Sequence, residues 1–400
     1  MSPAADGGNR SSPAEVFGAF LKLGCSAFGG PIAHLGYFER EFVGRRKWLD
    51  AAAYADLVAL CQFLPGPASS QVGMALGWKR AGWKGGTAAW LGFTLPSAVL
   101  MTALAFGLGS VGNLAHAGWV QGLKVAAAAV VAQAVVAMAR RLCPDVPRAA
   151  IAAAAAATLI LAPAAWMQVA VIAAGAGAGL LGRRWLAREP SSPTRAPMGS
   201  RTLGLGCLGF FLALLALLPW LAQVRPSPAL RVADAFYRSG ALVFGGGHVV
   251  LPLLQQATVA RGWLSPDTFL AGYGAAQALP GPLFAFSAYL GALVAPGGIA
   301  GALLALGSIY LPAVLILFAA LPFWERLRGQ PRARQLLAGA NAAVVGLLAS
   351  ALYSPIGTST LTTPLRCTLA AAAFAALQFR RVPPWLVVGA CAGLGAILLG

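Results

Sequence analysis

Long apolar stretches follow one another along most of the chain. A helix needs roughly 20 apolar residues to cross about 30 Å of hydrocarbon, and thirteen apolar segments approach or exceed that length, several late ones being shorter. They lie near 15–37, 51–77, 87–111, 122–139, 149–165, 167–182, 202–223, 230–252, 267–294, 299–323, 336–353, 366–379 and 385–400. The pattern predicts an all-α polytopic membrane protein with about 9–13 membrane segments.

The composition excludes a soluble protein. Apolar residues make up 58% of the chain and charged residues 10%, against about 45–50% and about 25% in a typical soluble domain. The 29 Lys and Arg outnumber the 11 Asp and Glu, and the net charge is +18. In a soluble protein this excess would indicate nucleic acid as a partner, but in a membrane protein it collects in cytoplasmic loops. We therefore expect the lipid bilayer, and no nucleic acid, as a partner.

The basic residues alternate from loop to loop. Connections without Lys or Arg, near 113–122, Trp166 and 354–364, separate Arg-rich ones. The positive-inside rule places the Arg-rich connections in the cytoplasm. They hold Arg140, Arg141, Arg148, Arg183, Arg184, Arg188, Arg195, Arg201, Arg326, Arg328, Arg332, Arg334, Arg380 and Arg381.

Gly and Pro interrupt the first two apolar segments of each half. The breaks read FGGP and LPGP in the first half, and FGGG and LPGP in the second. The loop between the first pair, EREFVGRRKWLD, is basic. It faces outside if both segments cross, and stays in the cytoplasm if both are re-entrant. We expect broken or re-entrant helices, because irregular backbone at membrane depth persists only where it is buried in protein or lines a polar cavity.

The two halves of the chain repeat one another. Motifs of the first half recur about 216 positions later in the same order. The matches are Phe20, Gly24 and Phe28-Gly29-Gly30 with Phe236, Gly240 and Phe244-Gly245-Gly246, Trp48-Leu49 with Trp263-Leu264, Gln62 and Leu64-Pro65-Gly66-Pro67 with Gln277 and Leu279-Pro280-Gly281-Pro282, and Leu95-Pro96 with Leu311-Pro312. We divide the chain into a polar N-terminal tail (1–14), a first repeat (15–182), a cytoplasmic linker with a connecting transmembrane helix (183–228) and a second repeat (229–400).

The connecting helix implies that the second repeat is inserted upside down. Six segments return the first half to the cytoplasm, and segment 202–223 crosses before the second half begins. Loop charge agrees, since the loop before Trp48 holds four Lys or Arg and the loop before Trp263 holds only Arg261. Inverted-topology repeats with interrupted helices are typical of secondary transporters, which bind substrate at the repeat interface.

The interrupted segments are the candidate substrate site. A helix broken at Gly or Pro exposes backbone N–H groups and the positive end of a helix dipole, and both favour anions. The alternative is that the Gly and Pro runs are packing devices, since both residues are frequent in membrane helices. The candidates for substrate binding at the breaks are Phe28, Gly29, Gly30, Pro31, Pro65, Gly66, Pro67, Gly245, Gly246, Gly247, Pro280, Gly281 and Pro282.

Lys22 and Arg238 occupy matching repeat positions inside apolar stretches, six residues before each FGG motif. A charge at membrane depth costs about 2.5–3.5 kcal/mol or more, and it usually marks a function or a partner. Two symmetry-related cations beside backbone donors suit a small dianion, so we predict that both bind the substrate. The alternative is that they reach the membrane interface or pair with Glu15 and Asp234.

Five further polar residues near the breaks have alternative interpretations. Gln62 and Gln277 are repeat-matched amides that either contact the ligand or join helices. His34 and His248 are not repeat-equivalent, and they either cap or join helices or take part in proton coupling. Asp56 lies well inside a first-half segment and is either a proton carrier, a counter-charge or a salt-bridge partner.

Polar residues also follow the first PGP motif. Ser69, Ser70 and Gln71 can donate hydrogen bonds to substrate oxygen atoms, whereas Leu283, Phe284 and Ala285 follow the second PGP motif. The two half-sites are therefore not chemically equal. Lys124 is expected at a helix end.

These motifs carry a family resemblance. FGGPIAHLGYFEREFV and QFLPGPASSQVGMALG in the first half, with FGGGHVVLPLL and QALPGPLFAFSAYLG in the second, resemble the chromate ion transporter family in its long, two-domain form. The resemblance covers nearly the whole chain. It implies a multi-pass carrier of the inner membrane that exports chromate from the cytoplasm, driven by the membrane potential or the proton gradient, and so gives chromate resistance. Sulfate or another tetrahedral oxyanion is the alternative substrate.

Other chemistry is not indicated. The six cysteines are scattered without a CxxC pair, and three histidines form no metal cluster. GxSxG, HExxH and paired buried carboxylates are missing from the sequence, so a membrane-embedded enzyme is a distant alternative. We expect no catalytic residue, no metal and no cofactor. A homodimer is left open.

Overall fold

Helices form every regular element of the described chain in this computed structural model, which describes residues 11–110, 117–181, 200–244, 247–324, 326, 330–380 and 382–399. The first half contains α1 (Pro13–Ser26), α2 (Gly30–Phe38), the π-helix η1 (Glu39–Arg45), α3 (Ala51–Phe63), α4 (Ala68–Ser110), α5 (Gly118–Leu142), α6 (Val146–Leu161) and α7 (Ala165–Leu181). A connecting helix, α8 (Arg201–Val224), follows.

The second half repeats this order. Its elements are α9 (Pro228–Ala241), η3 (Gly247–Val249), α10 (Val250–Thr258), α11 (Pro266–Ala278), η4 (Leu283–Ala285), α12 (Phe286–Leu293), α13 (Gly298–Ala320), η5 (Leu321–Phe323), α15 (Pro331–Ala351), η6 (Leu352–Gly357), α16 (Thr358–Thr360), α17 (Pro364–Gln378) and α18 (Pro384–Leu398).

Short polar side chains begin several of these helices. Ser12, Asp50, Asp145, Ser227 and Ser265 each accept a hydrogen bond from a backbone N–H three residues later, at the starts of α1, α3, α6, α9 and α11. Such caps satisfy N–H groups that a helix start leaves unpaired. In α1, α6, α9 and α11 a proline follows in the first turn, where it sacrifices no intrahelical bond.

Each LPGP motif leads into a helical hairpin. In α4, Ala81 and Gly82 leave the helical conformation, and a Cβ on Gly77 would lie 2.3 Å from the Gly85 carbonyl oxygen. Residues 68–80 and 83–110 therefore fold back against each other as a short and a long arm. In the second repeat α12 and α13 form the same hairpin, because a Cβ on Gly291 would lie 2.3 Å from the carbonyl oxygen of Gly301. The predicted interruptions lie just before these hairpins and are confirmed, since α3 ends at Phe63 and α4 begins at Ala68, and α11 ends at Ala278 and η4 begins at Leu283. Re-entrance into the membrane stays a prediction.

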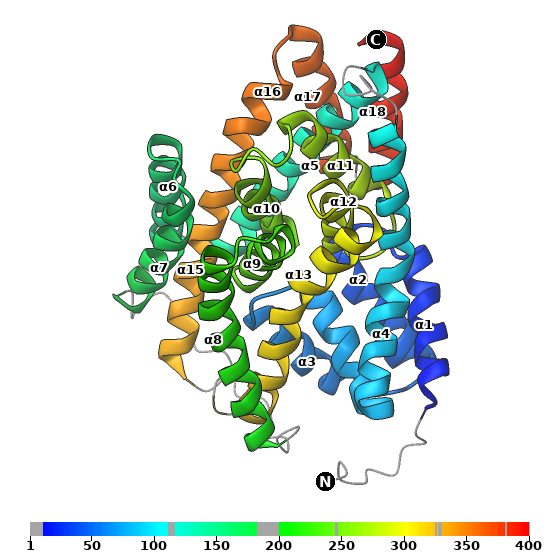
Figure 1. The fold of residues 1–400 in the computed structure, drawn as a ribbon, viewed down its shortest axis with the longest axis vertical. Coiled ribbons are helices and arrows are strands. Elements are labelled where there is room, and N and C mark those ends of the chain that lie inside the picture. The colour runs from blue at the N-terminus through cyan, green and yellow to red at the C-terminus, as the bar shows by residue number, and fades with distance from the viewer. Residues whose placement is uncertain are drawn as a thin grey trace.

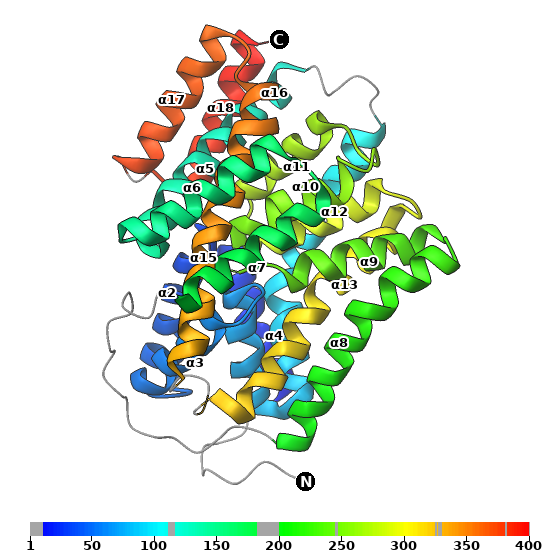
Figure 2. The ribbon, with the colours of Figure 1, turned by 90° about the vertical axis from the view of Figure 1, so that its left-hand side faces the viewer.

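The two repeats have opposite orientations. α1, α2 and α3 lie in the lower half of the molecule and α10, α11 and α12 in the upper half, in both views (Figures 1 and 2). The long arm of α4 rises from the lower half while α13 descends towards it. α1 packs along α4 and α9 packs along α13. The inverted-topology repeat is confirmed.

The last helices of each repeat pack against a helix of the other repeat. α6 and α7 of the first repeat pack on α15 of the second, and α17 and α18 of the second pack on α5 of the first. Small residues permit these contacts, since a Cβ on Gly175 would lie 2.8 Å from the carbonyl oxygen of Gly339, and a Cβ on Gly122 would lie 2.0 Å from that of Cys391. Each repeat therefore packs its last helices against a long helix of the other.

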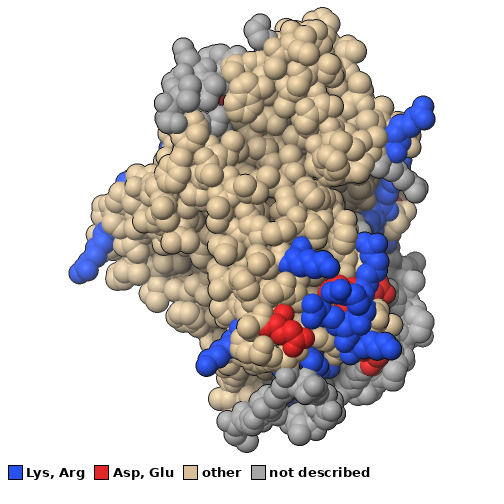
Figure 3. All heavy atoms as spheres, turned by 90° about the vertical axis from the view of Figure 1, so that its right-hand side faces the viewer, with Lys and Arg blue, Asp and Glu red and all other residues tan. Residues whose placement is uncertain are grey.

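The protein is a multi-pass membrane protein. Among the described residues, five helical stretches are long and apolar enough to cross a membrane, the first of which includes both arms of the α4 hairpin: Ala68–Gly107, Gly118–Leu142, Arg201–Val224, Gly298–Phe323 and Pro331–Thr360. Of these, α8 is the least covered by protein, since only 6% of its most apolar window is buried. Uncharged residues cover most of the face in Figure 3, and its Lys and Arg gather mainly in the lower part. A broad uncharged band of this kind suits contact with lipid.

Candidate functional site

Two reciprocal hydrogen bonds join the helix breaks of the two repeats. The Gly66 N–H, in the first LPGP turn, donates to the Val243 carbonyl at 2.7 Å, and Val243 immediately precedes the second-half FGGG motif. The Gly281 N–H, in the second LPGP turn, donates to the Ala27 carbonyl at 2.9 Å, immediately before the first-half FGG motif. Each LPGP turn is therefore held by the FGG break of the opposite repeat.

These two reciprocal hydrogen bonds are called the crossing below, and both of their donors must be glycine. Gly66 has φ 118° and Gly281 has φ 94°, a region that other residues enter only with strain. A Cβ on Gly66 would lie 2.8 Å from the Ala313 Cβ, and a Cβ on Gly281 would lie 2.9 Å from the Ser97 Oγ. Ser97 and Ala313 each follow the repeated Leu-Pro pair. The two turns therefore meet equivalent positions on α4 and α13.

The prolines around these glycines shape the same turns. The Pro65 carbonyl accepts a hydrogen bond from the Gln71 amide at 2.9 Å, and the Pro67 carbonyl accepts one from the Gln71 backbone N–H at 3.0 Å. In the second turn Pro282 caps η4 and Pro280 directly precedes Gly281. Because proline has no N–H, each glycine supplies the backbone donor at the middle of its turn.

The first FGG break lies against the second. Gly29 and Gly30 have φ 102° and 78°. Gly29 lies between α1 and α2, and Gly30 begins α2. A Cβ on Gly30 would lie 3.8 Å from the His248 Nε2. The Phe28 ring packs against Trp385 with 5.9 Å between ring centroids. Gly247 is buried at the start of η3, whereas Gly245, Gly246 and the Pro31 side chain lie outside the described part of the structure.

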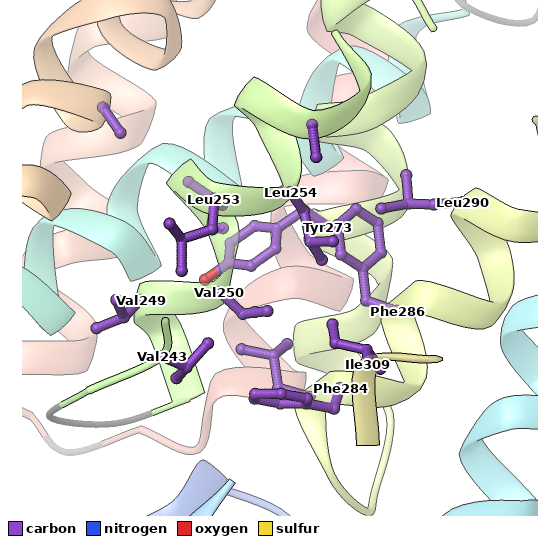
Figure 4. Close-up of a cluster of buried hydrophobic side chains, with 14 of the residues drawn as sticks. Val243, Val249, Val250, Leu253, Leu254, Tyr273, Phe284, Phe286, Leu290 and Ile309 are labelled. Atoms are coloured by element: carbon purple, nitrogen blue, oxygen red, sulfur yellow. The ribbon is translucent and has the colours of Figure 1, made fainter. Parts of the chain in front are cut away.

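Both predicted histidines make inter-helix contacts. His34 is buried on α2, and its Nδ1 lies 3.5 Å from the Ser69 Oγ on α4. The His248 Nδ1 lies 3.1 Å from the Tyr273 hydroxyl on α11. Figure 4 shows the Tyr273 ring enclosed by Val250 and Leu254 within the apolar core of the second repeat. These contacts fit the inter-helix interpretation, and proton coupling stays a prediction.

The two predicted glutamines have different surroundings. Gln62 is exposed, and its Oε1 accepts a hydrogen bond from Arg141 at 2.7 Å. The Gln277 Nε2 is buried and has no hydrogen-bond partner among the described residues. Asp56, on α3, accepts a hydrogen bond from the Trp324 indole at 3.1 Å. The structure therefore gives Gln62 and Asp56 partners of their own.

The two predicted cations are both partly or fully exposed. Lys22 is exposed on α1. Glu15, the partner that the alternative interpretation gave to Lys22, forms an ion pair with Arg46, with 3.4 Å between the Arg46 Nη1 and the Glu15 carboxylate. Arg238 is paired with Asp234 one turn earlier on α9, and 39% of its side chain is exposed. For Arg238 the structure therefore shows the predicted pairing alternative. Substrate contact by either cation stays a prediction.

Sequence reasoning missed several buried polar side chains beside the crossing. Thr94 and Tyr310 each have 2% of their surface exposed, and the Tyr310 hydroxyl faces Thr94 and Ser70. The Trp90 ring packs edge-on against Tyr310 with 5.5 Å between centroids. One sequence signal was available, because Thr94 and Tyr310 both carry a hydroxyl and both immediately precede the repeated Leu-Pro pair.

The expectation for Lys124 was wrong. Lys124 lies in the second turn of α5, with 3% of its side chain exposed, and its Nζ is 2.7 Å from Asp267 in the first turn of α11. Its Nζ also donates to the Gln121 Oε1 at 3.1 Å. This ion pair satisfies a buried charge and ties a first-repeat helix to a second-repeat helix, which the sequence pattern did not reveal.

Inverted repeats whose interrupted helices meet at the repeat interface are an architecture of membrane transporters, and this is the class of protein that the fold defines. A family model described as chromate transporter matches the chain twice, at residues 14–180 and 230–396. The chain therefore belongs to the chromate transporter family.

Relatives match over most of the chain. A chromate transport protein of Pseudomonas aeruginosa is 29% identical over 340 residues, which cover 84% of this chain and 79% of the relative. A chromate transport protein of Cupriavidus metallidurans is 26% identical over 395 residues, or 94% of this chain and 91% of the relative. An uncharacterized transporter of Methanocaldococcus jannaschii is 25% identical over 346 residues, or 85% and 83% of the two chains. No solved structure matches the fold.

Proposed function

We propose that this protein is a secondary transporter that exports chromate from the cytoplasm across the inner membrane and so gives chromate resistance. One observation carries the proposal: the LPGP turn of each repeat is hydrogen-bonded to the FGG break of the other, through Gly66 to Val243 and Gly281 to Ala27. Interrupted helices that meet at the interface of inverted repeats are where secondary transporters bind substrate. The names of the relatives support chromate as that substrate.

Chromate export does not require a coupling ion. Moving two negative charges out of an inside-negative cell releases roughly 4.6 kcal/mol per 100 mV, twice the value for one charge. The membrane potential alone is therefore a sufficient driving force, and the proton gradient is the second candidate.

Uptake into everted membrane vesicles tests the proposal directly. Vesicles from cells that produce the protein should accumulate radiolabelled chromate when energised, and vesicles from matched cells without it should not. Cells with the protein should accumulate less chromate than cells without it. Equal accumulation in both pairs would overturn the proposal. Collapsing the potential and the proton gradient separately, with valinomycin and nigericin in potassium buffer, identifies the driving force.

Sulfate is the second candidate substrate. It has the same charge and tetrahedral shape as chromate, and backbone donors do not easily distinguish the two. In the same vesicles, uptake of labelled sulfate without competition from chromate would assign the protein to sulfate. Mutual competition would assign it to tetrahedral oxyanions in general.

We also propose that the Arg-rich loops face the cytoplasm, as the positive-inside rule predicts. A reporter fused after Arg188, which lies outside the described residues, should then report a cytoplasmic position. A reporter at Thr360, between η6 and α17, should report an external one. The opposite pair of results would reverse the orientation and with it the direction of transport that we propose.

A further inference from the structure

Three hydroxyl-bearing side chains lie together where α4 meets α13. The Tyr310 hydroxyl faces Ser70 and Thr94, and each of the three residues has only 2% of its surface exposed. None of the three oxygen atoms completes a well-formed hydrogen bond with a described residue, and neither does the buried Nε1 of Trp90. These four side chains are called the hydroxyl cluster below.

The cluster is costly unless something binds to it. A buried polar atom without a partner costs about 1–3 kcal/mol, and native proteins contain few such atoms. The Tyr310 ring is fixed between Trp90 and Phe284, with centroid distances of 5.5 and 5.6 Å. The three hydroxyl oxygens are therefore gathered in one held position beside the Trp90 ring, which points to a polar ligand.

Repeat symmetry places the cluster at the expected position of a transported ligand. Thr94 and Tyr310 are equivalent positions of the two repeats, since each immediately precedes a Leu-Pro pair within a long helix. Their hydroxyls therefore approach one another across the repeat interface, where secondary transporters bind substrate. Ser70 lies in the first turn of the helix that begins at Ala68, where backbone N–H groups are free and the helix dipole is positive.

The chemistry of the cluster suits an anion that only accepts hydrogen bonds. Ser, Thr and Tyr hydroxyls can donate, and the indole N–H can only donate. A hydrogen bond to a charged group is stronger than one between neutral groups. Neutral donors also release an ion more readily than a buried cation would, and transport requires both binding and release. The unpartnered Oε1 of the neighbouring Gln71 is an acceptor, and it has no part in holding the anion.

We propose that Ser70, Thr94, Trp90 and Tyr310 form a charge-neutral subsite that binds a tetrahedral oxyanion through hydrogen-bond donors. This inference rests on the proposed function, because it names the groups that hold the transported ion. It differs from the prediction based on Lys22 and Arg238, in which cations do so.

Removal of single hydroxyls tests the subsite. We expect Tyr310→Phe and Thr94→Val each to raise the KM for chromate uptake into everted vesicles about ten-fold, which corresponds to about 1.4 kcal/mol. We expect the inhibition constant of sulfate to rise in parallel. The melting temperature of the purified variants without substrate should stay unchanged or rise, because each change removes an unpartnered buried oxygen.

Two matched variants serve as controls. Tyr353→Phe removes a hydroxyl from an exposed tyrosine, and Thr102→Val removes one from α4 that bonds to the Ala98 carbonyl at 2.8 Å. Both should keep the wild-type KM. A cluster that holds only water, or that is only structural, predicts an unchanged KM in Tyr310→Phe and Thr94→Val, and this result overturns the inference.

A failure of the proposed function gives a different result. If wild-type vesicles take up no chromate, chromate export is wrong, and equilibrium dialysis of the purified protein with radiolabelled sulfate then decides on the subsite. Sulfate binding by the wild type that is weakened about ten-fold in Tyr310→Phe supports the subsite. Equal binding by both proteins, or none by the wild type, rejects it.

Discussion

The two LPGP turns have the same backbone conformation, but the side chains that follow them differ in polarity. Gly66 and Gly281 have the same left-handed conformation, donate to equivalent carbonyls and face equivalent positions on the long helices. The residues that follow differ, because the first turn continues into the polar run Ser69-Ser70-Gln71, and the second into Leu283-Phe284-Ala285, all of them buried. Symmetry therefore extends to the scaffold and not to the side chains that follow the two turns.

This difference indicates which repeat supplies hydrogen-bond donors to the site and which supplies apolar packing. The reciprocal hydrogen bonds need only glycine and a carbonyl, so both repeats preserve them. A single ion on the interface can be held by donors from one side and packed by apolar groups from the other. Phe284 packs on the Tyr310 ring, while Ser70 and Thr94 present hydroxyls to it. The first repeat thus contributes most of the donors, and the second contributes Tyr310 and its apolar support.

The largest expected effect comes from the feature that the two turns share. Gly66→Val and Gly281→Val each force a branched residue into a left-handed conformation that costs about 1–2 kcal/mol. Each also adds a clash at the 2.8 or 2.9 Å contact of its Cβ, which costs about 1–3 kcal/mol or more, and disturbs a hydrogen bond whose buried groups cost about 1–3 kcal/mol each when unpaired. We expect both variants to lose the sharp gel-filtration peak of the purified protein to similar extents. A variant that is tolerated at one turn only would break the equivalence of the turns.

The next effect concerns α11, which leads into the second turn. Asp267→Ala leaves Lys124 buried without its partner, and breaking a buried pair costs about 3–5 kcal/mol. Lys124→Met removes the buried charge itself and leaves an aspartate that is 33% exposed, so it should cost less. The measurement is the melting temperature of each purified variant, with Lys124→Met/Asp267→Ala as the double-mutant control. Equal losses in both single variants would mean that the buried lysine is not the source of the cost.

A smaller effect is expected at Arg238, and it tests whether this cation is structural or binds the substrate. Arg238→Gln leaves the buried Asp234 without its ion-pair partner, so we expect lower stability and lower transport. The double variant Arg238→Gln/Asp234→Asn removes both charges and should recover most of the stability. If transport recovers as well, Arg238 is structural. If stability returns and transport does not, the substrate-binding prediction for Arg238 is supported, and Lys22→Gln then tests its repeat partner.

The smallest expected effect tests the chemical difference between the turns. Ser70→Ala removes one donor from the hydroxyl cluster and should raise the KM for chromate a few-fold, in line with one hydrogen bond of about 0.5–1.5 kcal/mol. Ala285→Ser adds a hydroxyl after the second turn and should leave KM unchanged, as long as protein levels match on immunoblots. Equal changes in KM at both positions would show that the two turns are chemically equivalent after all.

The sequence predicted the scaffold well. Apolar segment length, Gly and Pro breaks and the repeated motifs predicted an all-α, inverted-repeat membrane protein, and these features depend on local residue type. The pairing of each LPGP turn with the opposite FGG break was not predictable. It is made by main-chain atoms of Gly66, Val243, Gly281 and Ala27, and the side chains at these positions do not specify a backbone partner.

The candidate site was predicted less completely. Lys22 and Arg238 were predicted to bind the substrate because they are charges inside apolar stretches. The sequence does not show which side of a helix faces lipid, and Lys22 is exposed in the structure. The same criterion overlooked Thr94 and Tyr310, because single hydroxyls are common in membrane helices. Only the combination of repeat equivalence with burial and missing partners distinguishes them.

The reciprocal hydrogen bonds also constrain how the protein is made. Synthesis proceeds from the N-terminus, so the Gly66 N–H and the Ala27 carbonyl have no hydrogen-bond partner in the crossing until Val243 and Gly281 have been synthesised. The first repeat therefore enters the bilayer with both of its breaks unpaired, and it is completed only when the second repeat arrives from the opposite orientation. A chain truncated between the repeats should be a substrate for membrane proteases, because the polar backbone at its two breaks remains exposed.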